Sequence, residues 1–384
     1  MLDNGKAEGA RKIKQIEKYC LRDIAIVSQG FTFSRSYQGK KNLKWNYFKV
    51  ADIGINPNSK YLTNAINTIS DITMEEIGAL PFPKGSIVFP RVGAALFNNN
   101  KKILAQDGVV DDNVLVLTVT DTSKCWYEFL YYYLQGIPLA KWCNSGLVPV
   151  INTKTVLSQM VFLPPLPEQQ KIAAILSTQD KVIELKEKLL AQKQQQKKYL
   201  MQQLLTGKKR LSGFNEKWRF AKLENVSKYS ASAASFKTYE SHLGCGPYSV
   251  YDASGCFGNI DFYENEQPYI SIVKDGAGAG RVALCKEKSS TIGTLGCIFA
   301  NDIDLLYLFY CMSAVDFQIY SNGSTIPHVY YKDYKNMVLY LPCELEQKAI
   351  VEILSAADHE IDLLQKSIEA EKQKKKALMQ LLLT

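Results

Sequence analysis

The side chains able to do chemistry in this 384-residue sequence are mostly basic, amide and hydroxyl groups in glycine-containing segments. GFTFSRSYQGKKNLKW begins at Gly30, and FPRVGAALFNNNKK begins at Phe89. Arginine and lysine can donate to guanine, asparagine and glutamine suit adenine, and hydroxyl groups and backbone amides hold phosphate. Side-chain chemistry therefore indicates where base and phosphate contacts would lie if the chain binds DNA.

The candidate DNA contacts occur in both halves of the chain, and each of them could instead be a solvated surface residue. In the first half they are Thr32, Ser34, Arg35, Lys40, Lys41, Lys44, Arg91, Asn98, Asn99, Lys101, Lys102 and Lys154. In the second half they are Lys237, His242, Tyr251, Lys274, Arg281, Asn322, Ser324 and Lys332. The three lysines near position 40 are interpreted as phosphate contacts, because a lysine ammonium is a point charge.

Motifs of a self-contained enzyme are missing from the sequence. It has no NPPY-like tetrapeptide for a flipped base, and no GxxxxGK[ST] phosphate loop. DGAGAGR at Asp275–Arg281 follows an apolar run and has three interpretations: a nucleotide loop, a turn that approaches DNA phosphate, or a structural turn. We expect no catalytic residue and no cofactor in this chain.

Composition bounds the class of protein. Apolar residues make up 46% and charged residues 22%, as in an ordinary globular protein. Nine cysteines without a CxxC pair and only three histidines favour reduced thiols in the cytoplasm over disulfides or a metal site. No apolar stretch is long enough for a membrane span, and the polar residues 1–17 are expected to be a leader.

The net charge of +8 is unevenly distributed along the chain. Residues 1–162 hold 19 basic and 13 acidic side chains, whereas residues 211–340 hold 11 and 13. The first part can attract a polyanion through its overall field, and the later part cannot.

A long internal repeat organises the sequence. Leu163–Thr206 and Leu341–Thr384 align without a gap at a shift of 178, and 21 of the 44 positions are identical. Neither copy has Gly or Pro after its opening LPxxxEQ, so we predict uninterrupted helices from about Glu168 to Leu205 and from Glu346 to Leu383. Gly207 is expected to end the first helix.

Apolar residues recur every seven positions in both predicted helices, which is typical of a coiled coil. The seam is formed by Leu176, Ile183, Leu190 and Leu204 in the first copy and by Leu354, Ile361, Ile368 and Leu382 in the second. A lysine interrupts each row at the same place, Lys197 and Lys375. The alternative is two unrelated amphipathic helices on separate domains.

The segments before the helices also correspond, with Pro149 aligned on Pro327 and Lys154 on Lys332. We therefore predict two similar mixed α/β (α+β) domains, at 1–162 and 209–340, alternating with helical regions at 163–208 and 341–384. A helix fits Trp126–Leu134, and short β-rich runs alternate with Gly/Asn turns. The antiparallel helices, each roughly 57 Å long at 1.5 Å per residue, would relate the domains by a pseudo-twofold axis.

LPPLPEQ at the first helix start, GSIVFPRVGAALF and YISIVKDGAGAGRV carry a resemblance to the specificity subunit of type I restriction–modification systems. The resemblance runs from about residue 18 to the end. Two departures are Cys343-Glu344-Leu345, where the first copy has Pro165-Leu166-Pro167, and the acidic second domain.

The resemblance implies a non-catalytic subunit that reads a bipartite, asymmetric site on double-stranded DNA, one half with each domain. It implies docking of two adenine methyltransferase subunits around the helices, joined by restriction subunits in the full complex. S-adenosylmethionine, ATP and Mg are then expected on those partners. Candidate docking residues are Glu168, Gln169, Glu346 and Gln347, for which helix capping is the alternative. Other open functions are a scaffold with two protein-binding domains and a self-contained DNA-modifying enzyme.

Overall fold

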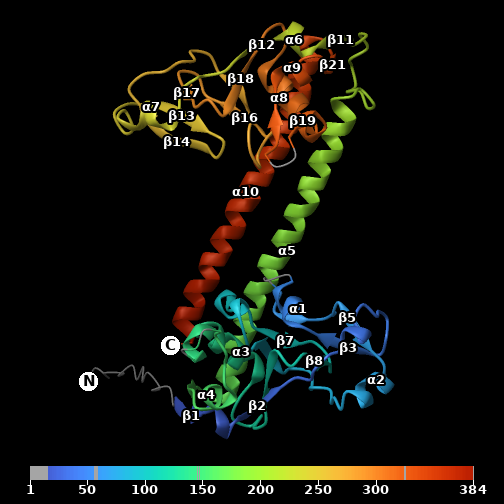
Figure 1. Cartoon of the computed structure of the whole chain (residues 1–384), viewed down its shortest axis with the longest axis vertical. Coiled ribbons are helices and arrows are strands. Elements are labelled where there is room, and N and C mark those ends of the chain that lie inside the picture. The colour runs from blue at the N-terminus through green and yellow to red at the C-terminus, as the bar shows by residue number, and fades with distance from the viewer. Residues whose placement is uncertain (1–15, 56–58, 145, 147, 324–325, 384) are drawn as a thin grey trace, which may run out of the picture. The chain divides into compact units, whose positions relative to one another are not determined.

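The computed structural model describes residues 16–55, 59–144, 146, 148–323 and 326–383 (Figure 1). The chain forms two compact units, one of Met1–Lys188 with Lys366–Thr384 and the other of Leu189–Gln365. Each unit contains a mixed α/β domain and parts of both long helices, so the predicted fold class is confirmed.

Domain one is built on a five-stranded sheet of order β2-β9-β6-β7-β4, with a three-stranded sheet β5-β3-β8 and a ribbon β1-β10. Its central strand β6 is fully buried, as its sequence IVFP requires. The strands are β1 (Glu17–Cys20), β2 (Ala25–Gln29), β3 (Trp45–Phe48), β4 (Tyr61–Leu62), β5 (Asn67–Ile69), β6 (Ile87–Pro90), β7 (Lys102–Leu104), β8 (Val109–Val110), β9 (Val114–Val119) and β10 (Met160–Leu163). The helices are α1 (Val50–Gly54), α2 (Asp71–Glu76), α3 (Tyr127–Gln135) and α4 (Thr153–Leu157).

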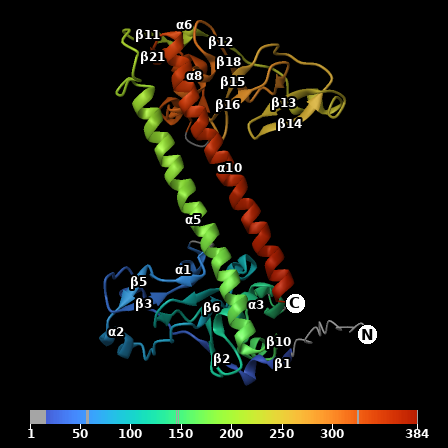
Figure 2. The ribbon, with the colours of Figure 1, turned by 180° about the vertical axis from the view of Figure 1, so that it is seen from behind.

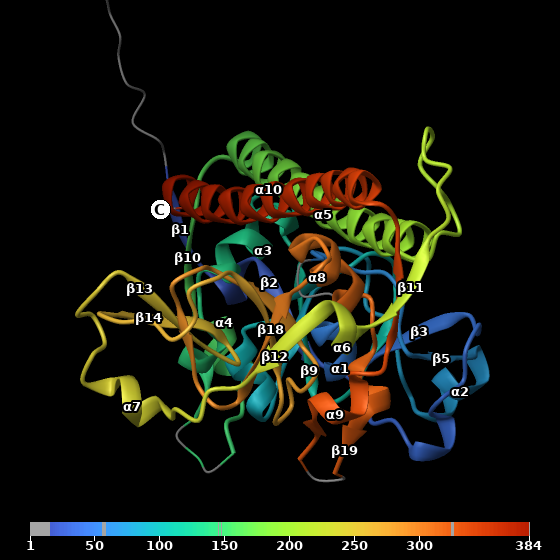
Figure 3. The same cartoon turned by 90° about the horizontal axis from the view of Figure 1, so that it is seen from above.

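Domain two has a four-stranded sheet β12-β18-β15-β16, a three-stranded sheet β14-β13-β17 and ribbons β11-β21 and β19-β20. Figure 3 shows β13 and β14 next to the short helix α7, whose Tyr239 packs with Val250 and Ile260. The strands are β11 (Arg219–Lys222), β12 (Ser227–Ser230), β13 (Tyr248–Asp252), β14 (Gly255–Ile260), β15 (Tyr269–Val273), β16 (Val282–Cys285), β17 (Ser290–Thr291), β18 (Leu295–Ala300), β19 (Ser321–Asn322), β20 (His328–Val329) and β21 (Val338–Leu341). The helices are α6 (Leu223–Val226), α7 (Phe236–Glu240), α8 (Leu305–Ser313) and α9 (Tyr331–Tyr334).

The two domains share one topology. The order β2-β9-β6-β7 corresponds to β12-β18-β15-β16, and β4 at the sheet edge has no counterpart in domain two. In each three-stranded sheet the middle strand, β3 or β13, pairs antiparallel with one neighbour and parallel with the other. The helix expected at Trp126–Leu134 is α3, which begins one residue later because Trp126 is its N-cap. Glu17, which we assigned to the leader, is the first residue of β1.

The repeated segments form α5 (Leu166–Leu204) and α10 (Glu344–Leu382), each an uninterrupted helix of 39 residues (Figure 1). Both begin two residues before the expected position, because the first turn accommodates Pro167 and its counterpart Leu345. Gly207 follows α5 with a φ of +68°, and a Cβ there would lie 3.2 Å from the Trp218 ring. The exact domain boundaries stay predictions. None of the described helices has the length and apolar content that a bilayer crossing needs.

The last turns of α10 pack on the core of domain one, as Figure 2 shows for the C-terminal end of the helix beside α3. Leu378, Met379 and Leu382 contact the cluster that includes the buried Leu176 of α5. In the other unit, Met201 and Leu204 of α5 share a core cluster with Leu354 of α10. The second helix therefore returns to the first domain, as predicted.

Polar contacts along the seam show that the helices are antiparallel in both units. Within the first unit Gln179 binds Glu371 at 2.7 Å and Lys186 binds Ser367 at 2.8 Å. The residue numbers along α10 therefore fall as those along α5 rise. Hydrogen bonds from Lys186 and Gln179 lower the pKa of the Glu371 carboxyl to about 2. Among the predicted seam residues Leu176, Ile183, Leu204, Leu354 and Ile368 are buried, and Leu190, Ile361 and Leu382 are half-buried.

The lysine in each seam meets a carboxylate of the facing helix. Lys375 forms an ion pair with Asp180 at 2.5 Å, and Asp180 also accepts the Tyr132 hydroxyl at 2.6 Å. The same group recurs in the second unit, where Lys197 pairs with Asp358 and the Tyr310 hydroxyl donates to that carboxylate at 2.8 Å. We call each of these a seam triad.

We expect Asp180→Ala to lower the free energy of unfolding by about 1–3 kcal/mol, because it leaves the Lys375 ammonium and the Tyr132 hydroxyl without their acceptor. Lys181→Ala is the matched control, since its pair with Glu184 is 58% and 43% exposed and should contribute less than about 0.5 kcal/mol. Urea denaturation of both variants measures the difference. Equal losses would show that the triad is not stabilising.

Candidate nucleic-acid interface

Arg91 directly follows the buried strand β6 and lines a cavity of about 330 Å³. Its Nε atom is buried and has no hydrogen-bond partner among the described residues. The cavity is otherwise polar in much of its lining, which includes Gln29, Asn144, Asn152, Thr153 and Thr155. An unsatisfied guanidinium facing a polar hollow is suited to bind an anion or a hydrogen-bond acceptor.

The predicted basic loop of domain one lies on the surface, since Thr32, Ser34, Arg35, Lys40, Lys41 and Lys44 are all exposed. Part of it is held by the protein. Lys44 pairs with Asp71 at 2.8 Å, and its hydrogen bond, with that of Trp45, lowers the pKa of the Asp71 carboxyl. Ser34 caps the short helix Arg35–Tyr37. Arg35, Lys40 and Lys41 have no acidic partner among the described residues, so they remain available to phosphate.

The structure does not place Lys101 and Lys102 on the surface, and their prediction as DNA contacts is wrong. They are 2% and 1% exposed, and burial lowers their pKa values to about 7 and about 8. Lys101 donates to the Asn99 side chain at 2.6 Å and to the Ile137 carbonyl at 2.9 Å. Asn99 also accepts from the Leu139 amide, so it too holds the loop together, whereas Asn98 is exposed. The run NNNKK predicts a basic surface loop, because the local sequence does not show that its lysines turn inward.

In domain two, Tyr251 and Arg281 line one cavity of about 290 Å³ between the two sheets' edges. The Arg281 guanidinium donates to the Ala253 carbonyl, and this hydrogen bond holds the side chain against the turn between β13 and β14. Lys274 follows the buried strand β15 and is half-buried. The DGAGAGR segment between them is a turn that joins β15 to β16. The structural elements of a nucleotide loop, a strand followed by a long helix, do not surround it.

The remaining candidates of domain two are scattered over its surface. His242 pairs with Asp261 at 2.8 Å, and Asn322 donates to Asp333 at 2.8 Å. Lys237 and Lys332 are exposed, as is Lys154 at the equivalent position in domain one. Ser324 lies outside the described residues.

The docking residues predicted at the helix starts serve the fold instead. Gln169 is fully buried, accepts from the Trp126 amide at 2.8 Å and donates to the Pro164 carbonyl at 2.8 Å. Gln347 makes the same two contacts, with the Asp304 amide and the Pro342 carbonyl. These hydrogen bonds fix the N-cap of α3 or α8 to the start of the long helix.

Glu346 is also unavailable to a partner, since its side chain is fully buried. Both of its carboxylate oxygens accept from Arg210 at 2.8 Å, and Trp218 donates to one of them at 2.9 Å. Glu168 is half-buried. The prediction of partner contact is therefore wrong for Gln169, Glu346 and Gln347, because a buried side chain that is fully hydrogen-bonded cannot reach another subunit.

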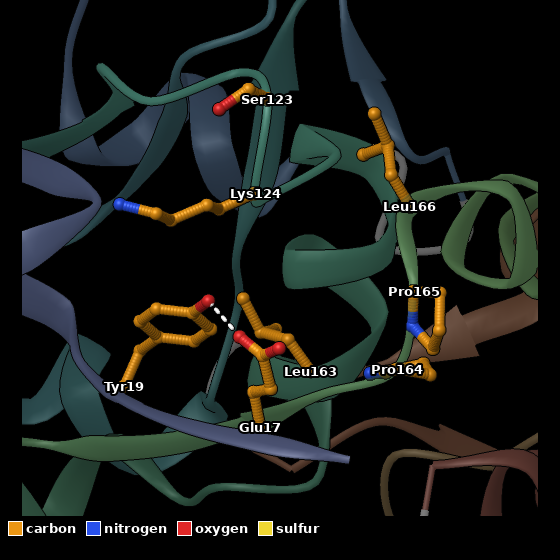
Figure 4. Close-up of a pocket in the computed structure, with 8 residues that line it drawn as sticks. All are labelled: Glu17, Tyr19, Ser123, Lys124, Leu163, Pro164, Pro165 and Leu166. Carbon is orange, nitrogen blue, oxygen red and sulfur yellow. Dashed lines mark hydrogen bonds between the residues drawn. The ribbon is translucent and has the colours of Figure 1, made fainter. Parts of the chain in front are cut away.

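A hollow lies beside each helix start. In domain one it has a volume of about 330 Å³, and Lys124 and Tyr19 face each other across it, with the Tyr19 hydroxyl bonded to Glu17 (Figure 4). In domain two the equivalent hollow has a volume of about 470 Å³ and contains the Arg219–Asp302 pair. Glu17 and Lys124 line the first hollow, and Arg219 and Asp302 line the second, with acidic and basic residues exchanged. The two hollows therefore do not share one ligand by charge alone.

Exposed apolar residues at equivalent positions of the two long helices were not predicted. Ile175 and Leu185 on α5 are 47% and 53% exposed, and their repeat equivalents Ile353 and Leu363 on α10 are 36% and 53% exposed. Ten residues turn an α-helix by about 1,000°, so the two side chains of each pair point about 80° apart and lie about 15 Å apart along the helix axis. We call these residues the outer stripe. The sequence signal was present in the repeat, but the seam residues dominated the pattern.

We expect the free energy of unfolding to rise between pH 7 and 8.5, because Lys101 has a folded pKa of about 7 and an ordinary unfolded value near 10.4. In that range the unfolded chain binds more protons than the folded chain, so loss of protons favours the folded state. Lys101→Met should reduce this slope by up to about 1.4 kcal/mol per pH unit, whereas Lys84→Met, at an exposed site, should not change it. Parallel pH profiles in urea denaturation would contradict the burial of a titrating ammonium.

The chain matches the family model of the type I restriction modification DNA specificity domain twice, at residues 13–195 and 215–372. The MjaX type I restriction enzyme specificity subunit of Methanocaldococcus jannaschii is 25% identical over 95% of this chain and 92% of its own length. The MjaVIII specificity subunit of the same organism is 37% identical over 131 residues, which cover 33% of this chain and 30% of that protein.

Two solved structures share the fold. The S subunit of a type I restriction–modification system from M. genitalium has a TM-score of 0.64 at 14% identity, with 98% of both chains covered. A chain from a structure of a type I restriction–modification system has a TM-score of 0.58 at 13% identity, with 96% of both chains covered. Since the two segments matched by the family model include most of the sequence, the chain belongs to the family of type I restriction–modification DNA specificity proteins.

Proposed function

We propose that this chain is the DNA-recognition subunit of a type I restriction–modification complex and reads a bipartite, asymmetric site with one domain for each half. The observation that carries the proposal is the duplication. Two domains with the same strand topology present different side chains at equivalent loops, so they are suited to two different base sequences. Family membership disfavours both the protein-binding scaffold and the self-contained enzyme.

The basic loop near Lys40 and the cavity at Arg91 supply candidate contacts in domain one, and Arg281 and Lys274 supply them in domain two. Domain two has more acidic than basic residues, so its binding depends on local placement of a few cations rather than on its overall field. Within each unit a seam triad pairs α5 with α10 in one register.

The same proposal places two methyltransferase subunits on the paired helices and restriction subunits in the full complex. The outer stripe supports helix docking, because exposed apolar side chains at repeat-equivalent positions offer one similar surface per repeat. S-adenosylmethionine, ATP and Mg belong to those partners in this scheme. The reduced thiols fit a cytoplasmic complex, since all nine cysteines are free.

The DNA-reading role is tested by mapping methylated adenines in cells that express the chain with its modification subunits. We expect one bipartite motif that disappears without this chain. Replacing residues 223–338 with the equivalent segment of the MjaX subunit should change one half of the motif and leave the other half unchanged. Methylation at the original motif without this chain would reject the proposal, as would a change in both halves.

Docking on the outer stripe is tested with Leu185→Glu and Leu363→Glu. Each variant should weaken binding of modification subunits by at least about tenfold, because a carboxylate then replaces an apolar contact. Lys181→Glu is the control at an exposed position of the same helix. Sedimentation of the purified complexes measures how many subunits remain bound. Full assembly of both variants would locate docking elsewhere on the chain.

A further inference from the structure

Arg91 is held by its backbone in a cradle of three hydrogen bonds. Its amide donates to the Asn113 carbonyl at 2.8 Å, and its carbonyl accepts from the Ile151 amide at 2.9 Å. Two residues on, the Gly93 amide donates to the Pro149 carbonyl at 3.0 Å. The cradle fixes the residue after β6 between the start of β9 and the chain that leads into α4.

Lys274 sits in the same cradle in domain two. Its amide donates to the Thr294 carbonyl at 2.9 Å, and its carbonyl accepts from the Val329 amide at 2.8 Å. The Gly276 amide donates to the Pro327 carbonyl at 3.0 Å. All three hydrogen bonds link equivalent positions, although Arg91 and Lys274 are different residues and the loops around them differ in sequence.

Both side chains are half-buried. The Arg91 Nε is buried and has no partner among the described residues. The neighbouring carboxylate of Asp275 is engaged by His328 at 2.6 Å. The two glycines have φ values of +82° and +88°, and a Cβ on either would meet no atom within 4 Å, so the turn beside each cation is open.

A feature that is identical in two domains serves what is identical in their two half-sites. The base sequences of an asymmetric site differ between the halves, whereas the sugar–phosphate backbone is the same in both. Arginine and lysine both bind phosphate, arginine through its planar guanidinium and lysine as a point charge. We infer that Arg91 and Lys274 are a matched pair of phosphate contacts, one in each half-site, and that they position the domains without reading bases.

This inference rests on the proposed DNA-reading function and assigns a role within it. Other exposed side chains, such as Arg35 in domain one, are then left for base contacts. The guanidinium and the ammonium each displace counterions from the duplex, so both should appear in the salt dependence of binding.

The test uses the complete methyltransferase complex. Its dissociation constant is measured over a range of salt concentrations, for a duplex that contains the motif that the complex methylates in cells. Arg91→Gln and Lys274→Gln should each reduce the slope of log K against log salt by about 0.9, the share of one phosphate contact. The methylated motif should stay unchanged. Lys84→Gln removes the same charge before β6 and should leave the slope as in the wild type.

The exchanges Arg91→Lys and Lys274→Arg keep the charge and are the least disruptive variants. They should retain the wild-type slope and motif, because each puts into one cradle the residue that the other already holds. Relaxed base preference at one position of the motif, in any of these four variants, would make the residue a base reader and overturn the inference. An unchanged slope in the glutamine variants would overturn it as well. If the wild-type complex bound no specific sequence, the proposed function itself would fail.

Discussion

A charged residue inside an apolar helix seam constrains this protein more than any other feature. Lysine at the seam is tolerated only where a carboxylate of the facing helix is in reach, and the chain supplies one in each unit, Asp180 for Lys375 and Asp358 for Lys197. A shift of one heptad in either direction would put Gln365 or Val351 opposite Lys197 in place of Asp358, so the triad of the second unit favours the observed antiparallel register as well as adding stability. The tyrosine of each triad comes from α3 or α8, which ties the register to the globular domain as well.

Buried polar groups also need partners at the starts of the two long helices. Glutamine and glutamate in LPxxxEQ look like surface groups, yet Gln169 and Gln347 satisfy backbone groups of the preceding helix, and Glu346 neutralises Arg210. Buried polar groups need every partner, and at a junction between a domain and a long helix the side chain is the only group that can bridge the two. The residues of the outer stripe, in contrast, are exposed.

The two domains differ in their balance of charged residues. Domain one combines an excess of positive charge with an exposed lysine loop, whereas domain two has more acidic than basic residues. Both domains nevertheless keep one basic residue in the same backbone cradle. Strand topology thus conserves the position of a cation between the repeats even where the surrounding charge has changed sign.

From the sequence alone, the repeat determined the two-domain α/β architecture, the length of both helices and their antiparallel return, because helical periodicity and an ungapped duplication are local and countable. The family resemblance followed from the same residues. Tertiary structure decided which polar residues are surface groups. Lys101 and Lys102 turn inward and Arg91 faces a cavity, although all three belong to one basic segment. Burial depends on contacts with strands distant in the chain, such as the one that brings Ile151 to Arg91, and no local pattern records them.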